Sequence, residues 1–146
     1  MGQVTVAFTA RLRKGSGLAC SEVVDGLVPY LTKAAAHFES TVPIYTFMPD
    51  HVHLIVRGSV GQSAPKLVMD EFKQRSGSWL KRQNLGFAWQ RNYWDHIIKP
   101  DQDWKEQVNY IAYNPVRRGL IENFREWPYT GSIGHDLREI LIEAAF

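Results

Sequence analysis

The sequence of 146 residues lacks the features that mark secreted and membrane proteins. It has a single cysteine, Cys20, so no internal disulfide can form and the fold cannot depend on an oxidising compartment. No stretch approaches the roughly 20 uninterrupted apolar residues of a membrane-spanning helix, and the N-terminus has no basic-then-apolar leader with a small-residue cleavage site. From these absences we expect a soluble, cytoplasmic protein.

The chain also has little net charge, with 17 Lys and Arg against 15 Asp and Glu, or +2 at neutral pH. This excess is too small to demand a polyanionic partner. The positive residues are nevertheless clustered and interleaved with aromatic side chains, as on surfaces that bind single-stranded nucleic acid, although solvated charges and core aromatics are the better explanation for most of the individual residues. The clusters are Arg11, Arg13 and Lys14, then Lys73, Arg75, Lys81 and Arg82, and finally Arg117 and Arg118.

The length and a hydrophobic content of 45% suffice for one packed core, and we expect a single domain over residues 1–146. Alternating, β-branched stretches predict strands, and apolar residues spaced three and four apart predict helices. Ser21 could cap the first helix, and Pro29 could kink it. The predicted strands are residues 4–11, 42–48, 51–56 and 89–98, the last broken near 92–95, and the predicted helices are 21–38, 66–81, 101–113 and, in the C-terminal tail, 129–146.

The order of these elements predicts the fold class. Strand, helix, strand, strand, helix, strand, helix is the split βαβ arrangement of an α+β, ferredoxin-like fold. We therefore expect an antiparallel sheet with helices on one face, together with a C-terminal helix that carries Tyr110. A tight turn at Pro49 and Asp50 joins the second and third strands into a hairpin.

A pair of histidines opens the third predicted strand, where residues 48–56 read MPDHVHLIV. Because alternate side chains of a strand share a face, His51 and His53 point the same way. Two imidazoles on one rigid face can hold a divalent metal ion. The alternative is that they are ordinary polar residues on the solvent face of a strand that enters from a turn.

The third predicted helix carries a phenol and an amide one turn apart. At about 100° per residue, Tyr110 and Asn114 lie on nearly one face, with Tyr113 about 60° to the other side of Tyr110. Asn114 has a structural alternative, because Asn before Pro115 is also a helix cap, and Gly119 would end that short turn. Tyr110 could likewise be a half-buried helix tyrosine.

Three stretches in this order carry a family resemblance. Residues 48–56, residues 89–98 (WQRNYWDHII) and residues 109–120 (NYIAYNPVRRGL) are similar to the IS200-like, single-tyrosine transposases of the HUH superfamily, most of all to the REP-associated tyrosine transposase branch. The resemblance covers roughly residues 44–128, whereas the first forty residues fit by their strand and helix pattern alone.

The resemblance implies an enzyme that cuts and rejoins single-stranded DNA with hairpin structure through a 5′-phosphotyrosine intermediate, with Mg²⁺ or Mn²⁺ as cofactor. It makes His51 and His53 the metal pair and Tyr110 the catalytic nucleophile. Asn114 stands where family members place a glutamine ligand, so the third metal ligand stays open. Asp50 replaces a more usual asparagine, and either orients an imidazole or forms the turn.

The resemblance also leaves alternatives. A noncatalytic or domesticated module of the same fold would bind DNA hairpins without forming an adduct, whereas a His-x-His-x-His hydrolase is disfavoured by Ile55 at the third position. We expect a monomer rather than a homodimer that donates its tyrosine in trans, and a structural or DNA-facing role for His96. The residues expected to hold DNA phosphates are Lys73, Arg75, Lys81, Arg82, Arg91, Arg117 and Arg118.

Overall fold

A central antiparallel sheet organises the chain, which is described by a computed structural model over residues 3–58 and 64–145. Its strands are hydrogen-bonded in the order β4-β1-β3-β2-β6, and β5 pairs with β1 beside β4. The hairpin strand β3 therefore lies in the interior of the sheet, between β1 and β2. The strands are β1 (Thr5–Lys14), β2 (Ser40–Phe47), β3 (His51–Gly58), β4 (Ala88–Trp89), β5 (Trp94–Ile97) and β6 (Thr130–Ile133).

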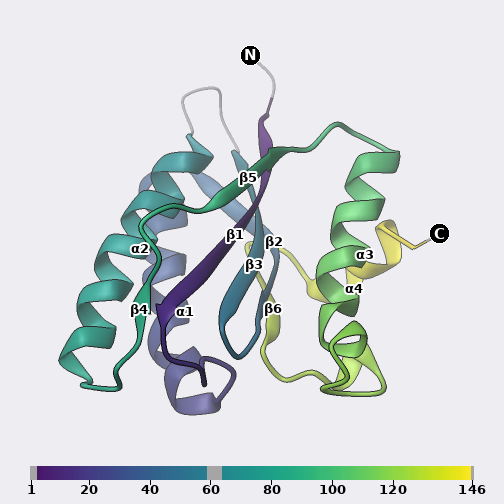
Figure 1. Cartoon of the computed structure of the whole chain (residues 1–146). Coiled ribbons are helices and arrows are strands. Elements are labelled where there is room, and N and C mark those ends of the chain that lie inside the picture. Colours follow the sequence, from purple (N-terminus) through teal and green to yellow (C-terminus); the bar gives the residue numbers. More distant parts are fainter. Residues whose placement is uncertain (1–2, 59–63, 146) are drawn as a thin grey trace.

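Helices cover both faces of this sheet (Figure 1). Helices α1 (Ser21–His37) and α2 (Pro65–Arg82) pack on one face, against side chains such as Phe8 and Leu54. Helices α3 (Gln102–Arg117) and α4 (Leu137–Glu143) pack on the other, against Ala7 and Ile55. Alternate residues of each inner strand thus feed two separate cores.

The predicted fold class is confirmed, with the helix that carries Tyr110 lying on the sheet face opposite α1 and α2. Inner strand β3 is buried along its first six residues, because both of its faces are covered. Among the described residues, no helix is long and apolar enough to cross a membrane.

The element boundaries agree with the sequence prediction except at a few positions. Cys20 rather than Ser21 is the N-cap of α1, without a side-chain bond, and the helix continues through Pro29. The predicted strand 89–98 is interrupted slightly earlier than expected, between β4 and β5. Lys73 of α2 stabilises this interruption, because its ammonium group donates hydrogen bonds to the carbonyls of residues 90, 91 and 92.

The predicted tail helix 129–146 is wrong in its first part. Strand β6 forms there and pairs with β2, and only α4 is helical; Phe146 lies outside the described residues. Gly131 lies so close to the Tyr45 ring that a Cβ atom would clash with it, and Gly134 turns the chain with φ of +87°. These two small residues favour a strand and a turn over a continuous helix.

The prediction that Asn114 caps a separate short turn is also wrong. Helix α3 runs through Pro115 to Arg117, so Asn114 lies inside it. Its true end is a Schellman motif, in which the Gly119 N–H donates to the Val116 carbonyl and the Leu120 N–H donates to the Pro115 carbonyl, both at 2.9 Å. Gly119 has the left-handed φ of +72° that this ending requires.

Candidate active site

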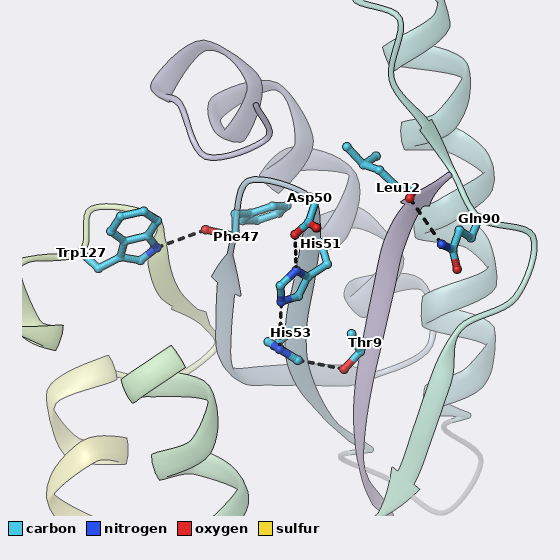
Figure 2. A network of polar contacts seen from close by, with 8 residues as sticks. All are labelled: Thr9, Leu12, Phe47, Asp50, His51, His53, Gln90 and Trp127. Atoms are coloured by element: carbon cyan, nitrogen blue, oxygen red, sulfur yellow. Dashed lines mark hydrogen bonds and ion pairs between the residues drawn. The ribbon is translucent and has the colours of Figure 1, made fainter. Parts of the chain in front are cut away.

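The two histidines of β3 lie side by side on the sheet face covered by α3, as the strand alternation predicts. Both are buried, and their Nε2 atoms are 3.1 Å apart. On the far side of each ring, the Asp50 carboxylate accepts a hydrogen bond from His51 Nδ1 at 2.7 Å, and the Thr9 hydroxyl is bonded to His53 Nδ1 at 2.8 Å. Figure 2 shows this chain of four side chains running from the hairpin turn to strand β1.

Burial and nearby cations keep both imidazoles uncharged. Burial lowers the pKa of His51, an effect that the hydrogen bond to Asp50 partly offsets. Burial lowers the pKa of His53 to about 3, together with the repulsion that a proton on His51 would exert and the charges of Arg11 and the arginines at the end of α3. Uncharged imidazole is the form that binds metal ions, so both rings are ready to act as ligands at neutral pH.

The donor set fits a divalent cation. Because the Asp50 carboxylate only accepts, neutral His51 carries its proton on Nδ1 and directs a lone pair from Nε2 towards His53. Two nitrogen ligands at right angles around one ion, each about 2.1 Å from it, lie about 3.0 Å apart, close to the distance found here. In the described part of the chain no group of three or more His, Cys, Asp or Glu is placed to hold a metal, so an amide, water or substrate would complete the shell.

Tyr110 of α3 faces this pair from the same chain. Its ring is perpendicular to that of His53, with the ring centroids 5.6 Å apart. The side chain remains 53% exposed. It lines a cleft of about 480 Å³ between α3 and strands β1, β3 and β5. The cleft is lined by Ala7, Phe8, Thr9, Arg11, His53, Trp94, Gln107, Tyr110 and Ile111.

Three arginines surround the histidines and the tyrosine. The Arg117 guanidinium lies 4.1 Å from the centre of the Tyr110 ring and donates a hydrogen bond to the Tyr110 carbonyl. Arg118 is close enough to lower the pKa of both histidines. Arg11 pairs across the sheet with His51 and also lines the cleft. The arrangement can attract and orient a phosphate group next to an accessible phenol.

Arg11 was not among the residues predicted to bind phosphate, nor was Thr9 named as a partner of His53. Both follow from the pairing of β1 with β3, in which Arg11 lies opposite His51 and Thr9 opposite His53. Strand pairing between distant segments leaves no local signal in one sequence. The hydrogen bond from His51 to Asp50 accords with the orienting role considered for that carboxylate, which also forms the turn.

The other residues of α3 take different positions. Tyr113 points away from the histidines and packs on Phe124, with ring centroids 4.3 Å apart. Asn114 follows Tyr110 by one turn and is 4% exposed. Within the described chain its amide makes no hydrogen bond to either imidazole, so its role as a third ligand stays a prediction.

The basic residues of α2 lie on the opposite side of the sheet from the histidines. Lys73 is held by backbone carbonyls, and Arg82 donates to the Tyr30 hydroxyl at 3.1 Å. Arg75 and Lys81 are not brought to the cleft either. Of the seven residues predicted to hold phosphates, the structure brings Arg117 and Arg118 to the histidines, and Arg91 lies in the exposed segment between β4 and β5.

The remaining histidines have partners of their own. His96 is bonded to the Asp103 carboxylate at 3.0 Å, which accords with a role other than that of a third imidazole ligand. His37 is bonded to Glu71 and His135 to Thr41.

Comparisons with known proteins place this geometry in context. The sequence matches the family described as "Transposase IS200 like" over residues 7–114. A REP-associated tyrosine transposase of Escherichia coli is 29% identical over 130 residues, covering 84% of this chain and 73% of its own length, and a Haemophilus influenzae protein assigned to the same group is 27% identical over 123 residues, covering 71% and 69%. A solved REP-associated tyrosine transposase bound to a REP hairpin has the same fold, with a TM-score of 0.75 at 23% identity over 87% of this chain and 75% of that one.

Proposed function

The chain belongs to the IS200-like transposase family, and on that basis we propose that it cuts and rejoins single-stranded DNA beside a hairpin, through a covalent bond between Tyr110 and a 5′ phosphate. The observation that carries this proposal is the position of Tyr110. Its side chain is exposed, and its ring centroid lies 5.6 Å from that of His53 within one chain. The hairpin substrate is inferred from the REP hairpin bound in the solved relative.

The proposed reaction is an in-line displacement at phosphorus. The Tyr110 oxygen attacks the scissile phosphate and loses its proton to solvent, the bond from phosphorus to the 3′ oxygen breaks, and the leaving oxygen takes up a proton. One phosphoester replaces another, so the energy of the bond is conserved. A 3′ hydroxyl from the same or another strand can reverse the attack and rejoin the DNA without a nucleotide cofactor.

The arginines supply the positive charge that this step needs. A phosphodiester repels anionic nucleophiles, and negative charge builds up on its oxygens as the new bond forms. Arg11, Arg117 and Arg118 lie around the histidines and Tyr110, where they would hold the phosphate and stabilise that charge. The guanidinium of Arg117 on the Tyr110 ring also limits rotation of the phenol.

His51 and His53, through their Nε2 atoms, would hold Mg²⁺ or Mn²⁺, with the amide of Asn114 as the proposed third protein ligand. Such an ion neutralises charge on a phosphate oxygen and helps to position the leaving group when it is bound. Asp50 and Thr9 keep the two rings oriented towards one point. Imidazole ligands suit Mn²⁺ somewhat better than Mg²⁺.

The test is a search for the covalent intermediate. Purified protein is incubated with Mn²⁺ or Mg²⁺ and DNA that carries a hairpin with single-stranded arms, and the products are separated on a denaturing gel. We expect a protein band shifted by covalent DNA, which Tyr110→Phe abolishes while hairpin binding persists.

Tyr113→Phe is the matched control, because it removes a hydroxyl from the same helix on a side chain that faces Phe124 instead. It should retain the band. Loss of the band in Tyr113→Phe alone would overturn the assignment of the nucleophile. Wild-type protein that binds a panel of hairpins, including REP hairpins, and never forms an adduct would identify a noncatalytic binding module instead.

A further inference from the structure

Trp94 is an exposed indole at the edge of the cleft that the proposed chemistry leaves without a role. It is 53% exposed, and it belongs to neither core cluster. It lines the same cleft as His53 and Tyr110, together with the amide side chain of Gln107 on α3.

The pairing of the strands fixes where this indole lies. Trp94 of β5 is directly opposite Thr9 of β1, and Thr9 is directly opposite His53 of β3. Cross-strand partners share a face, so these three side chains form one row across the sheet. Two strand spacings separate Trp94 from His53, or about 10 Å. A base next to a phosphate held at the histidines is within reach of the indole.

The indole is not buried, but neighbouring residues hold it in orientation. Its ring plane lies at 12° to that of His96, with the ring centroids 5.9 Å apart in an offset stack. The Asp103 carboxylate holds His96 Nε2 at 3.0 Å and also accepts the Lys99 N–H at 2.8 Å. Because the indole is both exposed and already held in one orientation, its side chain loses little conformational entropy when a flat partner stacks on it.

We propose that Trp94 is a stacking platform for one nucleobase of the DNA strand whose phosphate lies at His51, His53 and Tyr110. The proposal rests on the function proposed above and adds a base-binding subsite to it. A nucleobase is favoured over a protein side chain because the other groups around the cleft suit nucleic acid. Arg11, Arg117 and Arg118 supply positive charge for the backbone, and a stacked base needs no particular sequence.

The experiment measures binding by fluorescence anisotropy with a labelled DNA hairpin that carries single-stranded arms. Each arm nucleotide is replaced in turn by an abasic residue, and Tyr110→Phe serves as the background so that no adduct forms. We expect Trp94→Ala to weaken binding of the intact DNA about tenfold, and Trp94→Phe to restore most of it, because loss of one base stack has an effect of this order. When the DNA is abasic at the position whose base stacks on the indole, Trp94→Ala should cause no further loss of affinity.

Ile97→Ala is the matched control. Ile97 lies on the same strand, is 70% exposed, and pairs with Val6, whose side chain belongs to the core on the other face of the sheet. Its replacement removes exposed apolar surface from β5 and should leave DNA affinity unchanged. Circular dichroism checks that each variant is folded.

The outcomes separate this proposal from the proposed function. If Trp94→Ala binds every DNA as tightly as its parent, or weakens every abasic DNA by the same factor, the stacking platform is wrong even where wild-type protein forms the adduct. If one base is coupled to Trp94 but no DNA forms an adduct, the platform stands and the cleavage proposal fails. Altered self-association of Trp94→Ala in sedimentation, with unchanged DNA affinity, would identify a protein interface and overturn the platform.

Discussion

Asp50 and Thr9 each hold one imidazole by the nitrogen that faces away from the other ring. Asp50 only accepts, so it requires the proton of neutral His51 on Nδ1. Thr9 both donates and accepts, so it is compatible with a proton on either nitrogen of His53. The pair can therefore share one N–H between the rings, or direct both lone pairs at a cation, without any movement of the backbone.

Asp50→Ala should lower the affinity for Mn²⁺ by about 10- to 100-fold, the usual effect of removing the partner that orients a metal-binding histidine. Isothermal titration calorimetry measures it. Asp136→Ala is the control, because Asp136 caps the short helix α4 and is not among the residues that line the cleft. Equal Mn²⁺ affinity in Asp50→Ala and wild type would show that this carboxylate forms the turn but does not orient His51 for metal binding.

At the scale of elements, the end of α3 decides where two of the three arginines lie. Arg117 is the last helical residue, Arg118 is the C-cap, and Gly119 follows with its left-handed φ of +72°. The Schellman ending therefore fixes the backbone from which both arginine side chains extend.

Gly119→Ala should destabilise the protein by about 1–2 kcal/mol, because a Cβ atom makes the left-handed conformation unfavourable. Nothing lies within 4 Å of the added Cβ, so strain in the backbone is the main effect. Urea unfolding measures the free-energy change, and the denaturing gel measures adduct formation. Adduct formation should also fall, since the arginines at the helix end are displaced.

Gly86→Ala is the matched control for this prediction. Gly86 has φ of +77°, equally free space around it, and a place in the loop between α2 and β4. It should show a similar loss of stability with adduct formation unchanged at temperatures where both variants are folded. Equal adduct formation in the two variants would show that the end of α3 does not position the arginines.

Local patterns in the sequence predict most of these elements, but not their pairing. The alternation around His51 and His53 predicts a shared face, and the structure has it. The spacing of Lys73, Arg75, Lys81 and Arg82 predicts the polar side of α2, but it does not say on which face of the sheet α2 packs. Asn114 next to Pro115 resembles a helix start, because the tertiary packing that carries α3 through the proline leaves no local signal.

For the whole molecule, one chain contains both the histidine pair and the tyrosine that faces it. The two cores on opposite sides of the sheet hold these parts in place, since β3 is clamped between α1 and α2 on one face and α3 on the other. A monomer in which the tyrosine acts in cis stays a prediction.

A mixing experiment tests the cis arrangement. Tyr110→Phe lacks the nucleophile and His53→Ala lacks half of the histidine pair, so neither should form the adduct alone. An equimolar mixture should also form none, because no chain contains both parts. Wild-type protein mixed with either variant serves as the control and should give a band in proportion to its amount. Adduct formation in the mixture of variants would show that chains exchange the tyrosine helix.

The proposed role of Tyr110 as nucleophile determines the order in which DNA strands are opened and rejoined. On the proposed mechanism, one molecule can hold only one 5′ phosphate in covalent linkage. That DNA end occupies the cleft until a 3′ hydroxyl attacks it. Opening two positions on a strand therefore takes either two molecules or two successive turnovers. On this mechanism, when no second strand is present, the original 3′ hydroxyl reverses the attack and the DNA is restored to its starting sequence.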